Sequence, residues 1–140
     1  MSGPRQKLHS GNSSRYRDAA RVSLSPLVEV ALDDFRIASP RRIDEMLNGL
    51  LIGRETVALH AAGAVCTACV VAMDRVGDGL KLRVGLANDG MLALLASDEI
   101  VAVSLLNNIK LQFVLTGPML VQGDSHDFVE FQLPRELFRF

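Results

Sequence analysis

The sequence predicts a mainly β domain: a small antiparallel split β-barrel with one N-terminal helix and one short inserted helix. Seven short apolar runs separated by turn residues fill most of the chain, and such a series is typical of an all-β sandwich or barrel. A stretch with helical periodicity precedes the runs, and a shorter one interrupts them. A chain of 140 residues suits one domain. Closure of the sheet removes the exposed edges that so many short strands would otherwise present.

Residues 1–23 predict a flexible basic arm in front of the barrel. This stretch is rich in Ser and Gly and has little apolar periodicity, and its only acidic residue, Asp18, stands against the five basic residues Arg5, Lys7, Arg15, Arg17 and Arg21. A basic arm can contact phosphates or an acidic partner, but we favour a solvated leader. We therefore place the start of the domain proper at residue 24.

Ser39 and Pro40 predict the start of the N-terminal helix. Serine is a favoured N-cap, and proline is favoured at the first helical position, where its missing N–H costs nothing. Apolar residues then recur at helical spacing on one face, at Ile43, Met46, Leu47, Leu50 and Leu51. Gly53 is expected to end this helix, because glycine readily takes the left-handed conformation found at helix C-termini.

After the helix the pattern changes to strand-like runs, namely "ETVALHA", "VCTACVVAMD", "LKLRVG", "EIVAVSLL", "IKLQFVLTG", "MLVQG" and "FVEFQL". Asp78-Gly79 predicts a hairpin between the second and third runs, because a two-residue primed turn needs positive φ. Gly117-Pro118 predicts a bend or a bulge in a long strand, since proline cannot donate to an interior ladder. The segment "NDGMLALLASD" interrupts the series and is expected to form a short helix, or an apolar loop, that crosses the barrel.

The bulk composition excludes several classes of protein. A formal net charge of -1 and a pI near 6.3 argue against a general nucleic-acid binder, whose footprint is basic, so no DNA partner is expected. No run reaches the roughly 18 consecutive apolar residues of a membrane span, and the N-terminus lacks the apolar core of a signal peptide. We expect a cytoplasmic protein with no membrane insertion.

The residues offer no catalytic or metal centre, and we expect no enzyme. Cys66 and Cys69 have the spacing of half a zinc site, but no second such pair exists and both lie in a strand-like run, which favours ordinary buried thiols. His126 stands beside acidic residues in a turn, whereas catalytic triads are assembled from distant segments. His60 is a lone histidine in a strand, where a structural role is the usual one.

Four segments together resemble the N-terminal domain of the YcgR family of flagellar brake proteins. They are "DDFRIASPRRIDEMLNGLL", "TACVVAMDRVGDGLKL", "IKLQFVLTG" and the closing "FVEFQLPRELFRF", and the resemblance covers about residues 30–140. In that family a split-barrel domain, called YcgR-N or PilZN, precedes a PilZ domain that binds cyclic di-GMP, and the two-domain protein slows flagellar rotation by contacting the motor. The resemblance implies that residues 24–133 form a YcgR-N-like domain.

The end of the chain resembles the family's approach to its inter-domain linker. Leu133, Pro134, Leu137 and Arg139 match the family's lead-in. Residues 134–140 are therefore expected to start the linker toward a missing PilZ domain. Arg135 and Arg139 are the candidate ligand-binding residues, because an Arg-x-x-x-Arg spacing suits bidentate hydrogen bonds to phosphate. They fall a few residues before the family's linker arginines, and the PilZ partner motif has no counterpart here. This domain alone is therefore expected to bind no cofactor, with cyclic di-GMP as the ligand of the full-length family protein.

The resemblance implies a non-enzymatic regulatory domain of a cyclic di-GMP-responsive regulator of flagellar motility. Its expected partners are the PilZ domain of the same or a longer chain, a flagellar motor protein and, through the missing linker, cyclic di-GMP; recruitment to the flagellar basal body would follow. The sequence does not rank the surface arginines as docking residues, namely Arg41, Arg42, Arg75 and Arg83.

Two alternatives belong to other classes of protein. One is an FMN-binding split-barrel oxidoreductase, because split barrels also occur in flavin reductases. The other is a stand-alone dimerisation module that uses the apolar stretch "GMLALLASDEIVAVSLL", for which a plain core is the preferred interpretation.

Overall fold

The computed structural model describes residues 24–27, 32–61, 63–84, 88–124 and 127–140. The predicted basic arm, residues 1–23, and His126 lie outside the described residues. Within these ranges the helical elements are η1, a 3-10 helix (Leu32–Phe35), α2 (Pro40–Gly53) and α3 (Asn88–Leu95). The strands are β1 (Arg36–Ile37), β2 (Val57–Ala61), β3 (Ala64–Asp74), β4 (Gly79–Val84), β5 (Glu99–Leu106), β6 (Ile109–Thr116), β7 (Met119–Gln122), β8 (Asp127–Gln132) and β9 (Leu137–Arg139).

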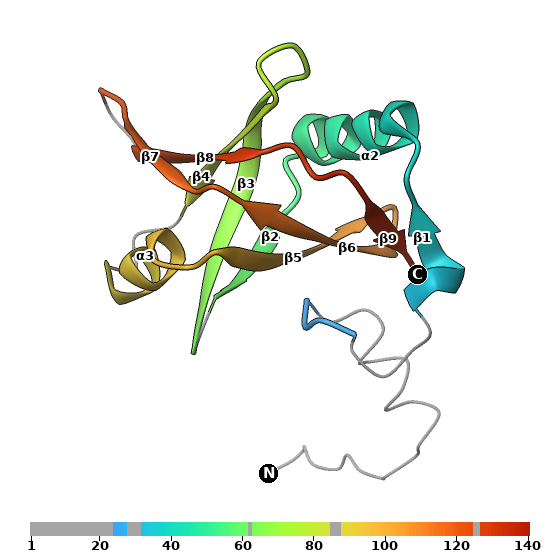
Figure 1. Ribbon diagram of the computed structural model, residues 1–140, viewed down its shortest axis with the longest axis horizontal. Helices are drawn as coiled ribbons and strands as arrows, with labels where there is room; N and C mark the ends of the chain where they lie inside the picture. The colour runs from blue at the N-terminus through green and yellow to red at the C-terminus, as the bar shows by residue number, and fades with distance from the viewer. Residues whose placement is uncertain (1–23, 28–31, 62, 85–87, 125–126) are drawn as a thin grey trace, which may run out of the picture.

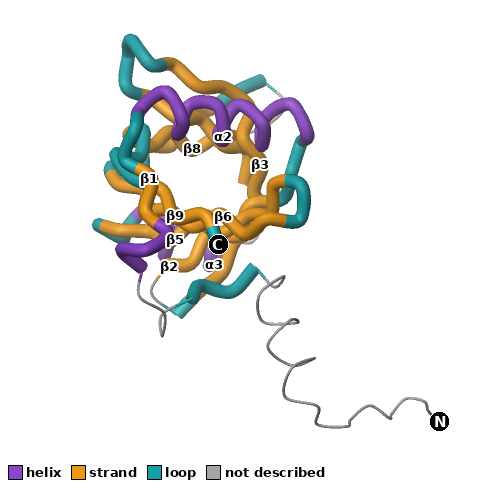
Figure 2. Tube along the Cα trace, turned by 90° about the vertical axis from the view of Figure 1, so that its right-hand side faces the viewer, coloured by secondary structure: helices purple, strands orange, loops and turns teal. Residues whose placement is uncertain are grey.

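These strands form one antiparallel sheet in the order β1-β9-β6-β5-β2-β3-β4-β8-β7. Figure 1 shows the sheet curling on itself, with α2 above it and α3 at the left. In the view of Figure 2 the strands surround a common centre, and α2 lies across from β6 and β9. The hydrogen-bonded order has β1 and β7 as its two ends, so the barrel is split. The predicted mainly β fold with two helices is confirmed.

One apolar core fills the centre of the curled sheet. Alternate strand residues and one face of α2 point into it, as the periods of two and 3.6 residues require. The fully buried side chains include Leu47, Leu50, Leu80, Leu82, Phe113 and Phe131. The predicted inserted helix, α3, lies against β2 and β3 and buries Leu94. No helix in the described ranges is both long and apolar enough to cross a membrane.

The helix α2 begins as predicted but ends differently. The Ser39 hydroxyl accepts a hydrogen bond from the Arg42 N–H at 3.4 Å, as an N-cap does. At the other end Gly53 is still helical, and Arg54 takes the left-handed conformation with a φ of 51°. The N–H groups of Arg54 and Glu55 donate to carbonyls of the last helical turn at 3.2 and 3.1 Å, which is the Schellman arrangement. The prediction that glycine supplies the left-handed stop is therefore corrected by one residue.

The predicted hairpin between β3 and β4 is present, but its turn is longer than expected. Asp74 pairs with Gly79, so four residues connect the strands, and the positive φ of 57° belongs to Asp78. A two-residue turn occurs instead between β5 and β6, where Asn107 and Asn108 both have positive φ. Asparagine tolerates this conformation better than most side chains, so the pair suits a primed hairpin turn.

The predicted bend at Gly117-Pro118 separates β6 from β7. Gly117 has a φ of +65°, a conformation that favours glycine. Before the bend β6 pairs with β5 and β9, and after it β7 pairs with β8. The chain thus leaves one side of the sheet for its far edge, which makes the bend a junction between two strands and not a bulge within one.

A second buried patch lies on the outer face of β2 and β6, opposite the core. The Gln112 side chain donates to the Leu27 carbonyl at 3.3 Å and accepts from the Leu27 N–H at 2.8 Å. The His60 ring bonds through Nε2 to the Leu24 carbonyl at 2.8 Å; because a carbonyl only accepts, Nε2 carries the proton. Residues 24–27, which we call the N-terminal strap, are thereby held against the sheet, and the structural interpretation of His60 is confirmed.

The last residues of the chain are also part of the sheet. Leu137 and Phe138 are buried, and β9 pairs with both β1 and β6. The Phe140 N–H donates to the Lys110 carbonyl at 2.9 Å, and its ring packs on Phe35 with centroids 5.1 Å apart. The region expected to start a linker thus contains a paired strand; that a linker follows it stays a prediction.

Candidate functional site

Exposed arginines are one set of polar groups with which this domain can contact a partner. Residues 24–140 contain 15 acidic and 10 basic residues, so any cluster of free cations is a local positive patch on an acidic body. Arg36 forms an ion pair with Glu136, with 3.1 Å between Nε and Oε2, and Arg75 forms one with Asp44. Among the described residues, no ion pair is formed by the exposed side chains of Arg41, Arg42, Arg54, Arg83, Arg135 and Arg139.

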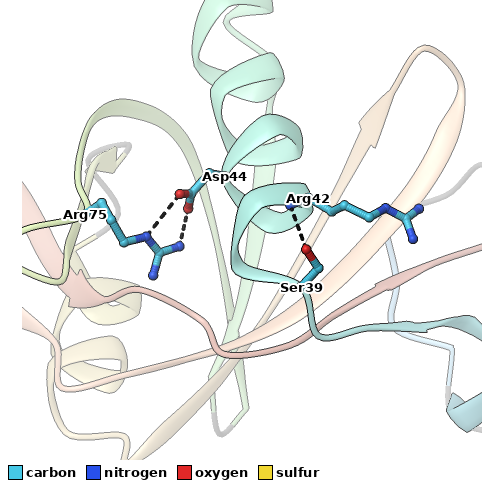
Figure 3. Close-up of polar contacts among 4 residues, drawn as sticks. All are labelled: Ser39, Arg42, Asp44 and Arg75. Carbon is cyan, nitrogen blue, oxygen red and sulfur yellow. Dashed lines mark hydrogen bonds and ion pairs between the residues drawn. The ribbon is translucent and has the colours of Figure 1, made fainter.

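The Arg75–Asp44 pair ties the β3–β4 turn to α2. Figure 3 shows the Arg75 guanidinium facing the carboxylate with two contacts, of which Nε to Oδ2 is 3.1 Å. This hydrogen bonding raises the pKa of Arg75. In the same view the Arg42 guanidinium extends away from the pair into solvent. Arg75 is therefore committed to the fold, whereas Arg42 is available to a partner.

The predicted ligand-binding residues, Arg135 and Arg139, lie in the segment that contains β9. Both are exposed, Arg135 just before the strand and Arg139 at its end, where it pairs in the ladder with Leu111. Leu137 and Phe138, which lie between them, are buried, and the backbone of Arg139 is held by its pairing in the sheet. Their role in ligand binding stays a prediction.

A surface hollow of about 520 Å³ lies where the C-terminal end of α2 meets β3 and β4. We call it the α2–β3 hollow. Its lining includes Leu51, Ile52, Arg54, Cys69, Val71 and Arg83. Two arginines thus line one depression together with apolar residues, among which Ile52 is 74% exposed.

Three local features bring these side chains together. The left-handed conformation of Arg54 turns the chain at the end of α2, and a non-glycine residue pays roughly 1–2 kcal/mol for it. Cys69 and Arg83 are direct partners in the β3–β4 ladder. The ladder register shifts at Val71, and such bulges bend a strand and re-aim its side chains. The sequence reasoning missed Arg54, because Gly53 was expected at the left-handed position.

The two cysteines are free thiols in different settings. Cys66 is buried and Cys69 is half-buried. Burial raises the pKa of the Cys66 thiol, since an apolar environment disfavours the thiolate. The interpretation of both as buried thiols is therefore correct for Cys66 but incomplete for Cys69, which lines the hollow.

The fold and the surface define a split-barrel domain with a basic and apolar depression, and comparison with known proteins gives the family. The model of the PilZN domain of the flagellar regulator YcgR matches residues 35–139. This chain belongs to the PilZN family. The resemblance in the four sequence segments is thereby confirmed, and the match includes β9.

Two flagellar brake proteins YcgR are related in sequence. The protein of Leptothrix cholodnii is 37% identical over 78 residues, which are 56% of this chain and 31% of the relative. The protein of Methylibium petroleiphilum is 31% identical over 105 residues, which are 74% of this chain and 46% of the relative. The chain therefore spans less than half the length of these curated relatives.

Two crystal structures from Escherichia coli share the fold. The isolated YcgR-N domain matches with a TM-score of 0.70 and 17% identity, over 77% of this chain and 96% of that one. YcgR in complex with cyclic di-GMP matches with a TM-score of 0.72 and 16% identity, over 79% of this chain and 48% of that one. This chain thus shares the fold of the YcgR-N domain.

Proposed function

We propose that this chain is the N-terminal, non-enzymatic interaction domain of a cyclic di-GMP-responsive regulator of flagellar motility. The observation that carries the proposal is the PilZN match over residues 35–139. Support comes from two relatives that are named flagellar brake proteins. The matched region covers 31% and 46% of their lengths. In this proposal the domain docks on a PilZ half and on a motor protein in the cytoplasm, at the flagellar basal body.

Cyclic di-GMP acts in this proposal through the region that follows the chain. Binding there changes how the two halves face each other, and the motor protein binds one arrangement more tightly than the other, as a switch requires. Arg135 and Arg139 are exposed next to that region, so they can add bidentate contacts to a phosphate held mainly by the linker and the PilZ half. This domain alone binds no cofactor in the proposal.

The two alternative functions have less support. A flavin-binding oxidoreductase shares only the type of barrel, and fold alone is a poor guide to function. For a dimerisation module, the apolar stretch through α3 and β5 would have to be exposed, yet Leu94, Ile100 and Ala102 are buried in the core. Leu92, at 69% exposure, is the large apolar residue of this stretch that does face solvent.

Two measurements test the proposal. Calorimetric titration of cyclic di-GMP should give binding to the chain extended into its PilZ half and none to these 140 residues alone. Deletion of residues 24–140 from the longer protein should abolish braking of swimming while leaving nucleotide affinity largely intact. A deletion that still brakes swimming would refute the proposed function, and tight binding by the short chain would show that Arg135 and Arg139 form a site by themselves.

A further inference from the structure

We propose that the α2–β3 hollow binds a segment of a partner protein in which carboxylates flank an apolar side chain. The proposal rests on the proposed function, because it assigns one surface to the contact between this domain and a protein partner. It is carried by three observations on the hollow: its unpaired charges, its exposed apolar residue and its strained arginine.

The charges of the hollow call for a partner with carboxylates. Arg54 and Arg83 both line it, and neither forms an ion pair with another described residue. Arg75, by contrast, is paired with Asp44. Guanidinium groups bind carboxylates through two parallel hydrogen bonds, which are stronger than bonds between neutral groups. On a body with more acidic than basic residues, this hollow is a distinct place for an acidic segment to dock.

The apolar lining calls for an apolar side chain on the same segment. Ile52 is 74% exposed at the rim, and Leu51 and Val71 lie beside it, both only partly buried. Burial of this apolar surface by an apolar side chain of the partner would be favourable, and arginine is enriched among the few contacts that dominate protein interfaces. A purely anionic ligand would leave this surface in water.

The backbone conformation of Arg54 is the third observation behind the proposal. Its φ of 51° is a conformation in which glycine avoids the steric cost that other residues pay. Backbone strain of this kind is concentrated at binding and catalytic sites. The glycine that would relieve it stands one position earlier, at Gly53, inside the helix.

The lining favours a peptide over a nucleotide. None of the described residues that line the hollow is aromatic, and none has a hydroxyl or amide side chain. A base would therefore lack both a ring to stack on and side-chain groups that pair with its edge, which nucleotide sites normally supply. A peptide with carboxylates and an aliphatic side chain, in contrast, can pair with the two arginines and cover the apolar residues of the lining.

The test is a titration of the ¹⁵N-labelled chain with a short synthetic peptide in which glutamates flank two leucines. Saturable shifts should map to the amides of Arg54, Cys69 and Arg83. The variants Arg54→Gln and Arg83→Gln should each weaken binding by about tenfold, the effect of one charge-assisted hydrogen bond. The matched control is Arg41→Gln, which removes an equally exposed and unpaired charge near the other end of α2 and should leave the affinity unchanged.

A second pair of variants tests the apolar part of the hollow. Ile52→Ser should weaken the peptide severalfold, whereas Val76→Ser, at a residue 99% exposed in the β3–β4 turn, should have no effect. A peptide with glutamines in place of the glutamates should bind about tenfold more weakly or not at all.

Several outcomes would overturn the inference. One is that about 1 mM peptide, a concentration at which weak binding is detected, causes no amide shifts. Another is that Arg54→Gln and Arg41→Gln weaken peptide binding equally, which would indicate unspecific charge attraction. A third is that cyclic di-GMP or FMN shifts these amides and the peptide does not. If deletion of the whole domain relieves braking while the peptide does not bind and Arg54→Gln still brakes, the hollow is the wrong surface and the proposed function stands. If the deletion leaves braking intact, the proposed function itself fails.

Discussion

At the scale of single residues, the buried ionisable groups report most directly on the environment that the fold creates. Lys110 is only 2% exposed on the outer face of β6, although lysine is rarely buried to that degree. Desolvation lowers its pKa, because burial disfavours the ammonium form. Folding is therefore less favourable with Lys110 charged than with Lys110 neutral, and we call this difference the cost of the charge.

This cost predicts a pH dependence for the variant Lys110→Met. The unfolded chain holds the Lys110 proton up to its ordinary pKa of about 10.4, whereas the folded chain releases it at a lower pH. Between these two values the unfolded state binds more protons, so stability rises with pH there. We therefore expect the stability of Lys110→Met relative to the parent to decrease as the pH approaches the ordinary lysine value, because the parent gains stability over this range.

Urea unfolding at a series of pH values measures this difference. The control is Leu111→Met on the same strand, whose difference from the parent should not vary with pH, because neither side chain titrates. A constant stability difference between Lys110→Met and the parent across the alkaline range would show that the Lys110 pKa is not lowered in the folded state.

The two thiols predict a selective labelling pattern. Cys66 is 2% exposed and its pKa is raised, while Cys69 is half-buried beside the two arginines of the hollow. Because the thiolate is the reactive form, iodoacetamide at mildly alkaline pH should modify Cys69 at least about tenfold faster than Cys66. Mass spectrometry of Cys66→Ser and Cys69→Ser separates the two sites, and both should react equally in denaturant. Fast labelling of native Cys69→Ser would contradict the burial of Cys66.

At the scale of the elements, the left-handed conformation of Arg54 at the end of α2 lowers the stability of the domain, while the Arg54 side chain serves the hollow. The variant Arg54→Gly should stabilise the domain by about 0.5–1 kcal/mol in urea unfolding, because glycine takes the left-handed conformation without the steric cost. The same variant should lose peptide binding. Arg54→Ala is the matched control: it should also lose binding, but with no gain in stability, since alanine keeps the left-handed strain. Equal stability of the glycine and alanine variants would indicate that the arginine conformation is unstrained.

The N-terminal strap depends on one side chain of β6. In Gln112→Leu both hydrogen bonds to Leu27 are lost, at about 0.5–1.5 kcal/mol each, so a loss of roughly 1–3 kcal/mol is expected in urea unfolding. Hydrogen exchange of the Leu27 amide should become fast, since its N–H loses its acceptor. The control is Gln122→Leu on β7, an exposed glutamine that should change neither quantity. Continued protection of Leu27 in Gln112→Leu would show that other contacts hold the strap.

At the scale of the whole molecule, the last strand, β9, is a structural part of the barrel. β9 joins β1 to β6, and Leu137 and Phe138 are buried. Burial of each such side chain contributes about 1.5–3 kcal/mol, a large share of the roughly 5–15 kcal/mol of a typical domain.

Truncation after Leu133 should therefore lower the Tm by at least about 10 °C or abolish cooperative unfolding, as measured by circular dichroism. The double variant Arg135→Ala and Arg139→Ala, which changes only exposed side chains of the same segment, should leave the Tm nearly unchanged. A truncated chain with the parent's Tm would mean that residues 134–140 behave as linker and contribute nothing to the barrel.

The sequence by itself determined the local structure of this protein. The predicted helix from Pro40 and seven predicted runs correspond to α2 and to β2 through β8, because periodicity and capping depend on residues that are neighbours along the chain. The four segments, in their order along the chain, also indicated the family, and the PilZN match confirms it. The Asn107-Asn108 turn was equally local, and its sequence signal was overlooked.

The tertiary structure alone decided where distant residues meet. The two residues of β1 and the three of β9 are too short to show a period, and they are strands because each completes the other's hydrogen bonding. Arg54 and Arg83 share a hollow because α2 packs on a curled sheet whose register shifts at Val71, and no pattern within either segment encodes that meeting. Contacts between segments far apart in the chain depend on how the sheet closes, which is a property of all the strands together.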